Sequence, residues 1–148
     1  MTNTQQKVQI RSMEPEDIDA IFAIDRKISG MQRAITYKDL IHGVIGGQID
    51  RSFVAEINGQ VIGFVLASLT YVAEQVTEAC TIQILGVDPD HWRQGIATKL
   101  TRMLLKRCRS GGIKTIRVMV DQNDSELQGF FKSMGFRRGR LIDYSTEV

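Results

Sequence analysis

The sequence predicts a mixed α/β fold, in which four helices flank a mostly antiparallel central sheet of six to seven strands. Strand-like and helix-like segments follow the order β-α-α-β-β-β-α-β-α-β, and the tail leaves room for one further strand. Asn58-Gly59 joins two of the strand-like segments and favours an antiparallel hairpin, because both residues tolerate positive φ. A helical segment between the strands around Ile82 and Val120 indicates a parallel crossover. No repeat or linker divides the chain, so we expect one domain over residues 1–148.

The first half of the chain places two helices between its strands. Residues 8–11 alternate like a short strand, and Pro15 suits the first turn of the next helix, where its missing N–H is not needed. Apolar residues at helical spacing predict a second helix over residues 36–46. The two arms of the hairpin are expected at residues 52–57 and 61–70.

Residues 79–87 form the next predicted strand, with its side chains divided between two faces. One face is expected to carry Cys80, Ile82 and Ile84, and the other Thr81, Gln83, Leu85 and Val87. Gly86 is a candidate β-bulge, because a glycine inside a strand often marks one. The following helix begins at Gly95 and ends at Gly111-Gly112, where a left-handed cap is least costly.

The last part of the chain predicts a strand, a helix and a strand-like tail. Ile116, Val118 and Val120 alternate as the strand. Asn123 is the expected N-cap of the last helix, which ends before Gly135. Residues 136–147 are strand-like again and supply the last strands of the predicted sheet.

Composition narrows the class of protein. The chain is 43% apolar and 24% charged with a net charge of +2, which is typical of a soluble globular domain. Its basic residues are scattered, so no nucleic-acid partner is expected. No apolar run suits a membrane span or a signal peptide, and we expect a cytoplasmic protein without a membrane partner. Cys80 and Cys108 are expected to be reduced core residues, not a disulfide or a metal site.

The connection VDPDHWRQGIAT, between the strand at residues 79–87 and the next helix, has the residues of an anion site. The first turn of a helix has unpaired N–H groups and a partial positive charge. Gly95 lets the backbone approach a pyrophosphate, Arg93 adds a charge and Thr98 adds a hydroxyl. Strand-turn-helix junctions of this kind also occur for structural reasons alone, and the spacing is neither that of a P-loop nor that of GxGxxG.

This loop and the later run Phe130-Phe131-Lys132-Ser133-Met134-Gly135-Phe136 together resemble the GNAT superfamily of N-acyltransferases. The loop of that family reads [Q/R]-x-x-G-x-[G/A]. Gly95 and Ala97 match it, whereas Trp92 stands where Gln or Arg is usual. The resemblance covers nearly the whole chain, and it implies a GNAT-like fold that takes acetyl-CoA, or another acyl-CoA, as co-substrate and needs no metal.

The resemblance also implies where the cofactor lies. Pantetheine would pair with main chain around Leu85 and Val87, and the pyrophosphate would lie on the amides from Arg93 to Thr98. A main-chain N–H near Val87 would polarise the thioester carbonyl. Asn123 is included because Asp124 occupies the usual position of a cofactor-binding Asn. The expected cofactor-binding residues are Leu85, Gly86, Val87, Trp92, Arg93, Gln94, Gly95, Ile96, Ala97, Thr98, Asn123, Asp124, Phe130 and Phe131.

The residues that the family uses for proton transfer are absent. By alignment with the family, its usual Glu falls on Thr81 and its usual Tyr on Phe131, and neither residue can act as base or acid. Glu78 is the nearest carboxylate, expected either to act through water or to be solvated. Either Tyr144 or Tyr71 would supply the acid in place of Phe131. The alternative is that each of these tyrosines only packs against its neighbours. Because a thiol has a pKa of about 8.5, thiolate is a tolerable leaving group even without an acid.

The resemblance implies direct transfer of an acetyl group from acetyl-CoA to a primary amine of a small molecule, peptide or protein. The acceptor is expected near residues 30–36, with Arg33 and Tyr37 as candidate contacts, and a homodimer is left open. Neither histidine is interpreted as catalytic. His42 is expected to be structural or exposed, and His91 to be a ring-bearing spacer in the cofactor loop. The vacant Glu and Tyr positions favour one alternative, an acyl-CoA sensor with little or no turnover. Nucleic-acid binding through the Arg-rich helix and tail is another.

Overall fold

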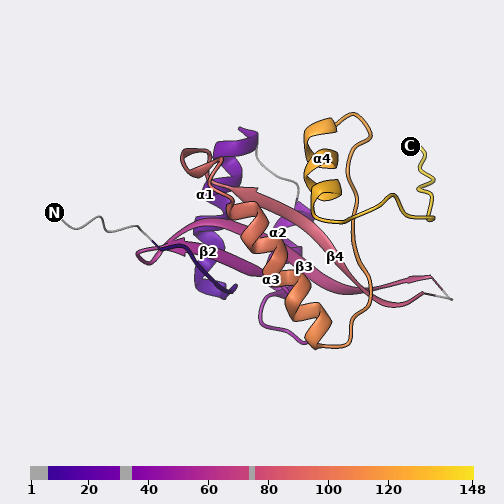
Figure 1. Ribbon diagram of the computed structural model, residues 1–148, viewed down its shortest axis with the longest axis horizontal. Helices are drawn as coiled ribbons and strands as arrows, with labels where there is room; N and C mark the ends of the chain where they lie inside the picture. The colour runs from indigo at the N-terminus through magenta and orange to yellow at the C-terminus, as the bar shows by residue number, and fades with distance from the viewer. Residues whose placement is uncertain (1–6, 31–34, 74–75) are drawn as a thin grey trace.

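The computed structural model describes residues 7–30, 35–73 and 76–148, and its elements follow the predicted order as far as the last helix (Figure 1). In chain order they are β1 (Gln9–Ser12), the 3-10 helix η1 (Pro15–Asp17), α1 (Ile18–Ser29), α2 (Ile35–Val44), β2 (Phe53–Ile57), β3 (Gln60–Ala73), β4 (Val76–Val87), the 3-10 helix η2 (Pro89–His91), α3 (Ile96–Ser110), β5 (Ile116–Val118) and α4 (Ser125–Ser133). The periodicity of the sequence therefore located these elements correctly.

The strands form one sheet in the order β1-β2-β3-β4-β5. Neighbours are antiparallel from β1 to β4, and β5 joins β4 in parallel, as a crossover through α3 requires. The β2–β3 hairpin turns at Asn58 (φ 51°) and Gly59 (φ 79°), which confirms the predicted turn. The mixed, mostly antiparallel sheet with four helices is confirmed, with five strands in the described part of the chain in place of six to seven.

The tail accounts for the difference in strand number. Residues 136–148 form no strand, and every residue from Arg137 onward is exposed. A strand-like pattern needs a partner strand and a buried face, and the described part of the chain supplies neither to residues 137–148. The N-cap of α4 also differs from the expectation, because Asp124 and not Asn123 accepts the helical N–H of Leu127, at 3.0 Å.

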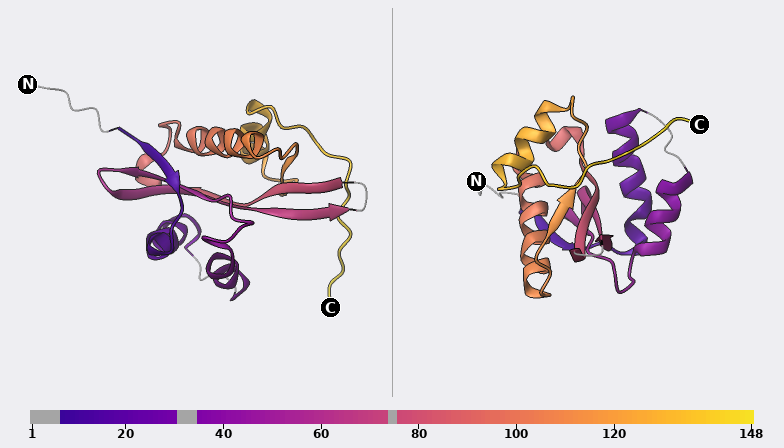
Figure 2. Two further views of the ribbon diagram at one scale, coloured as in Figure 1. Left: turned by 90° about the horizontal axis from the view of Figure 1, so that it is seen from below. Right: turned by 90° about the vertical axis from the view of Figure 1, so that its right-hand side faces the viewer.

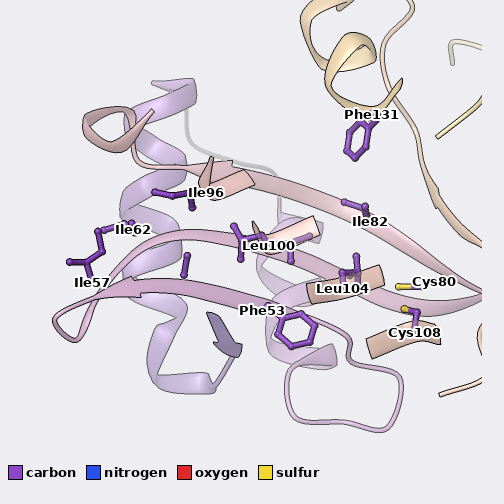
Figure 3. Packing of buried hydrophobic residues seen from close by; sticks show 13 residues of the cluster. Phe53, Ile57, Ile62, Cys80, Ile82, Ile96, Leu100, Leu104, Cys108 and Phe131 are labelled. Atoms are coloured by element: carbon purple, nitrogen blue, oxygen red, sulfur yellow. The ribbon is translucent and has the colours of Figure 1, made fainter. Parts of the chain in front are cut away.

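Two helical layers cover the sheet, with α3 and α4 on one face and α1 and α2 on the other (Figure 2). The larger core lies under α3 and includes Phe53, Ile62, Ile82, Ile96, Leu100, Leu104 and Phe131 (Figure 3). The smaller core lies under α1 and includes Ile21, Ile24, Phe64 and Leu66. Cys80 and Cys108 are free and buried in the larger core, which confirms their expected role. None of the helices in the described ranges has the length and apolar character that crossing a membrane requires.

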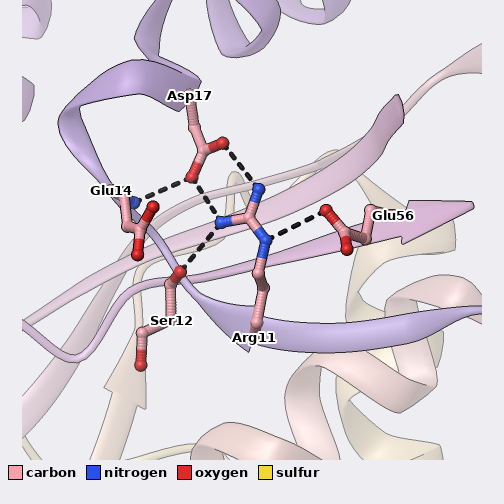
Figure 4. Close-up of polar contacts among 5 residues, drawn as sticks. All are labelled: Arg11, Ser12, Glu14, Asp17 and Glu56. Carbon is pink, nitrogen blue, oxygen red and sulfur yellow. Dashed lines mark hydrogen bonds and ion pairs between the residues drawn. The ribbon is translucent and has the colours of Figure 1, made fainter. Parts of the chain in front are cut away.

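Arg11 joins β1 and β2 to the turn that starts α1 (Figure 4). Its guanidinium donates to both oxygens of Asp17 at 2.8 Å and to Glu56 at 3.0 Å. Asp17 also accepts the Glu14 N–H at 2.8 Å. Burial raises the pKa of Asp17, but the bonds from Arg11 and from the Glu14 N–H outweigh it and hold that pKa below its usual value. A charged carboxylate therefore fixes the start of α1 on the sheet.

Candidate active site

The strand β4 has a β-bulge at Gln83, close to the point where β5 leaves it. Leu66 on β3 pairs with Ile84 and Ala67 pairs with Ile82, so Gln83 has no partner on β3. A bulge bends its strand and increases the local twist. Because β5 pairs with β4 only as far as Ile82, β4 has an open edge from Gln83 to its end.

The bulge also changes the faces of β4, which corrects the expectation of strict alternation. Ile84 packs against the core under α1, whereas residues on both sides of the bulge pack in or against the core under α3, namely Cys80, Ile82, Leu85 and Val87. Alternation in one sequence cannot reveal an extra residue opposite a partner strand. Gly86, the expected bulge, is instead a position of close packing, where a Cβ would lie 2.9 Å from the ring of Phe64.

The main chain of Leu85 and Val87 points to the open edge. The N–H of Cys80 bonds to Thr115 O, just before β5, at 2.9 Å, whereas the N–H of Asp88 bonds to a β3 carbonyl at 2.7 Å. Residues 80 and 88 would point the same way in a regular strand, so the bulge has reversed the alternation. Leu85 and Val87 lie an odd number of residues from Asp88, and they therefore direct their N–H and C=O groups away from β3. The N–H and C=O of Leu85 and the N–H of Val87 are placed to pair with an extended ligand.

Trp92 lies against the end of this edge. Its indole N–H donates to Val87 O at 2.7 Å, while the residue remains 55% exposed. The bond occupies the Val87 carbonyl and leaves the Val87 N–H for a ligand. The departure from the family loop at Trp92 therefore closes the open edge at its C-terminal end.

The helix α3 begins with an open N-terminus beside the same edge. Gly95 has φ 75°, and no side chain caps the helix. Arg93 also has a positive φ, 64°, which is uncommon for a residue with a Cβ. Left-handed residues beside right-handed ones turn successive N–H groups toward one point, and such a concavity binds anions. Arg93, Gln94 and Gly95 are exposed, and Ile96 anchors the turn in the core with 1% exposure.

An ion pair holds the loop against α1. Lys27 Nζ lies 3.2 Å from a carboxylate oxygen of Asp88 and 3.2 Å from one of Asp90. Asp88 also accepts the Asp90 N–H at 3.0 Å and thereby caps η2. Burial raises the pKa of Asp88, but the bonds from the Asp90 N–H and from Lys27 outweigh it, so this pKa lies below its usual value. The bonds to Asp88 and Asp90 raise the pKa of Lys27, and the pair is charged at neutral pH.

On α4, Phe131 forms part of the core and not of a proton-transfer site. It is 4% exposed and packs edge-on against Phe130, with ring centroids 5.1 Å apart, and against Phe136, also at 5.1 Å. Figure 3 shows its ring directed from α4 toward the sheet. Asn123 and Asp124 are exposed at the start of the helix, and the carboxylate of Asp124 is engaged as the cap.

The structure does not bring the predicted proton-transfer residues together. Glu78 is exposed and lies nine residues before Val87 on β4, which is roughly 30 Å along the strand. Tyr71 is 70% exposed and pairs with Glu78 across the hairpin. Tyr144 is 90% exposed in the tail. Of the residues predicted to act in catalysis, Glu78, Tyr144 and Val87, only Val87 lies beside the loop.

Thr81, at the usual Glu position, has a polar partner that the sequence did not indicate. Its hydroxyl oxygen lies 2.6 Å from that of Thr70 on β3. Thr70 and Lys27 reach their partners, Thr81 and Asp88, only through the fold, so the sequence could not indicate them. The bulge at Gln83 has a weak signal in the sequence, because the apolar pair Ile84-Leu85 after it interrupts the alternation. A hydroxyl pair can bind a polar ligand, but it is a poor base.

Part of the expected acceptor region lies outside the described residues. Arg33 falls in 31–34, which the structure does not describe, and the side chain of Tyr37 is also outside the described set. His42 is exposed on α2, and His91 is partly exposed in η2. The exposure of His42 agrees with its prediction, and the interpretation of His91 as a spacer stays a prediction.

Comparison with known proteins adds sequence relatives. An uncharacterised N-acetyltransferase of Methanocaldococcus jannaschii is 27% identical over 94 residues, which cover 63% of this chain and only 42% of that protein. The [ribosomal protein bS18]-alanine N-acetyltransferase of Escherichia coli K12 is 22% identical over 89% of this chain and 82% of its own length.

A solved structure shares the fold over the whole chain. The aminoglycoside N-acetyltransferase AAC(6')-Iy in complex with CoA superposes with a TM-score of 0.82 and 16% identity, covering 100% of both chains. The model of the Acetyltransferase (GNAT) family matches residues 18–136, which span the loop, the bulged strand and α4. The chain therefore belongs to the GNAT family of acetyltransferases.

Proposed function

We propose that this protein transfers the acetyl group of acetyl-CoA directly to a primary amine. The observation that supports this most is the open edge of β4, with the main chain of Leu85 and Val87 beside the uncapped N-terminus of α3. Pantetheine is an extended chain with amides, so it would pair with this edge as an added strand does. The pyrophosphate would meet the N–H groups that follow Gly95, with Arg93 supplying charge.

In the proposed reaction the neutral amine attacks the carbonyl carbon of the thioester. The C–N bond forms, the C–S bond breaks, and the products are an amide and CoA. The N–H of Val87 would stabilise the developing oxyanion. The amine proton would pass to solvent, because Glu78 lies roughly 30 Å along β4 from Val87. The thiolate would also take its proton from solvent, since Tyr71 pairs with Glu78 and Tyr144 lies in the exposed tail.

Two of the relatives indicate acceptors with which to begin. One is named for an aminoglycoside and the other for an alanine of a ribosomal protein, and both of these molecules carry an amine that an acetyl group can modify. We propose a primary amine on a small molecule, peptide or protein as the acceptor class. An amine panel should therefore include an aminoglycoside and a peptide that presents an alanine amine. Thiol release from acetyl-CoA by the full chain would measure turnover.

Glu78→Gln should leave the rate and its pH profile unchanged, because Glu78 lies roughly 30 Å along β4 from Val87. A lower rate with a shifted pH profile would show that Glu78 takes part in proton transfer.

The loop assignment has its own test. Gly95→Glu places a carboxylate where the pyrophosphate would lie, on a residue with no neighbouring atom within 4 Å of an added Cβ. We expect CoA affinity, measured by calorimetry, to fall at least about tenfold, which is about 1.4 kcal/mol. Gly46→Glu is the matched control, because Gly46 has φ 81° and the same open surroundings. Equal affinities for the two variants would place the cofactor elsewhere.

A sensor that binds acyl-CoA without turnover is the second candidate. It is favoured by the residues at the usual acid and base positions, since Phe131 is in the core and Thr81 bonds to Thr70. Calorimetry and the thiol-release assay together separate the two functions. Tight binding of CoA with no thiol release on any amine would support the sensor.

A further inference from the structure

Three polar residues form a row across the sheet, one on each of β3, β4 and β5. Thr81 on β4 pairs with Ser68 on β3 and with Arg117 on β5. The residues on either side of these three belong to the core under α3 or pack against it, namely Ala67, Leu69, Cys80, Ile82, Ile116 and Val118. Because side chains alternate between the two faces of a strand, the polar row lies on the opposite face of the sheet, which is the face that α1 and α2 cover (Figure 2).

The hydroxyl groups on this face have unused hydrogen-bonding capacity. Ser68 is 4% exposed, and the hydrogen bonds found in the described ranges include none made by its hydroxyl. Thr81 Oγ1 lies 2.6 Å from Thr70 Oγ1, so one hydroxyl of this pair donates to the other. When Thr81 is the donor, Thr70 donates in turn to Ala79 O at 3.4 Å, which is long for a bond between two oxygens. When Thr70 is the donor, the O–H of Thr81 is available to a ligand.

Arg117 places a cation without a counterion beside these hydroxyls. It is partly exposed, and the ion pairs found in the part of the chain that the structure describes do not include it. Asp50 bridges to β3 in the same register, but its carboxylate already accepts the N–H groups of Gly46 and Ser52. The two parallel N–H groups of a guanidinium match the two oxygens of a carboxylate, and a neighbouring O–H adds a third bond. The row therefore has the chemistry of a carboxylate site.

We propose that Arg117 and the hydroxyls beside it bind a carboxylate of the acceptor, so that the acceptor is an amine that also carries an acidic group. This inference rests on the proposed acetyl transfer. The unpaired edge of β4 begins at Gln83, two residues after Thr81 and about 7 Å along the strand. Two residues of an extended peptide cover that distance, so a peptide can present its amine at the edge while an acidic side chain lies over the row. A polycationic amine would instead meet Arg117 with like charge.

Two peptides of equal length test the site. The amidated peptides Ala-Asp-Asp-Ala and Ala-Asn-Asn-Ala present the same amine, and only the first carries carboxylates. Calorimetry on the full chain in the presence of CoA should show the acidic peptide binding at least about tenfold more tightly, and the difference should shrink as salt is added. Equal affinities for the two peptides would overturn the proposal, whether or not either of them is acetylated.

Variants of the row assign the preference to its residues. Arg117→Gln should remove the preference for the acidic peptide, and Arg117→Lys should restore part of it. Thr81→Val should reduce the preference, whereas Thr81→Ser, which keeps the hydroxyl, should retain it. Arg102→Gln is the matched control, because Arg102 is exposed on α3 and should not affect the preference. A preference that survives Arg117→Gln, in a variant with the circular dichroism spectrum of the wild type, would overturn the site. If that variant fails to fold, Thr81→Val and the wild-type comparison of the two peptides still decide.

Thiol release separates this inference from the proposed function. With acetyl-CoA present, we expect kcat/KM to be at least about tenfold higher for the acidic peptide. Equal thiol release on the two peptides would contradict the carboxylate site and support acetyl transfer. Selective binding of the acidic peptide with no thiol release on any amine would contradict acetyl transfer but not the carboxylate site.

Discussion

At the scale of single residues, the proposed cofactor loop depends on charges supplied by another element. Lys27 on α1 contacts Asp88 and Asp90, and Asp88 caps η2 just before the left-handed residues Arg93 and Gly95. The sequence indicated the loop, because Gly95 and Arg93 stand at a strand-to-helix junction. It did not indicate Lys27, which lies 61 residues before Asp88. The sequence alone does not show which distant residues the fold brings together in an ion pair.

Lys27→Met should loosen the loop without altering the chemistry. Because exposed ion pairs contribute little, we expect KM for acetyl-CoA to rise by no more than about fivefold with kcat unchanged. Lys27→Arg should restore KM, and Lys7→Met should leave it unchanged. A fall in kcat with constant KM would show that Lys27 does not act through the loop. Steady-state kinetics at low ionic strength gives both constants.

At the scale of elements, the bulge in β4 decides which main-chain groups face the unpaired edge. The extra residue Gln83 bends β4 where β5 leaves it and turns the main chain of Leu85 and Val87 toward that edge. Hydrophobic periodicity found β4 with nearly its observed length. It misplaced the face of Ile84, because the bulge is defined by pairing with β3 and not by the sequence of β4 alone.

Deleting Gln83 should leave the fold intact and remove the unpaired edge of β4. Without the extra residue β4 becomes regular, both cores keep their side chains, and β5 can continue to pair beyond Ile82. We expect a cooperative unfolding transition close to that of the wild type, and CoA affinity at least about tenfold weaker by calorimetry. Gln83→Ala keeps the bulge and should keep the affinity. If the deletion variant binds CoA normally, CoA binding does not need the bulge.

At the scale of the whole molecule, the two cores hold the helical layers on the sheet, together with the contacts of Arg11 with Asp17 and Glu56. Asp17 is 5% exposed and is bonded to Arg11 and Glu14, so its folded-state pKa lies below the unfolded value. Its contribution to stability is therefore complete above that unfolded value and is lost as the pH falls through the folded-state pKa.

Asp17→Asn should therefore destabilise the protein in a manner that depends on pH. At pH 7 we expect a loss of about 1.5–3 kcal/mol, the usual contribution of hydrogen bonds to a charged group. The difference from wild type should shrink below about pH 4, where the wild-type carboxyl also becomes protonated. Urea unfolding at several pH values measures it, with Asp19→Asn, on the exposed side of α1, as the control. A difference that stays constant with pH would show that the charge of Asp17 is not what stabilises α1.

The sequence by itself determined the order of the elements, the hairpin turn at Asn58-Gly59, the buried cysteines and the loop at Gly95. These features depend on local propensity, periodicity and turn chemistry, which adjacent residues carry. Only the tertiary structure decided the bulge at Gln83, the contact of Lys27 with the loop, the Thr70–Thr81 pair and the absence of a strand after α4. Each of these depends on which residues become neighbours across the fold, and a strand in particular requires a partner strand that the tail's own sequence cannot supply.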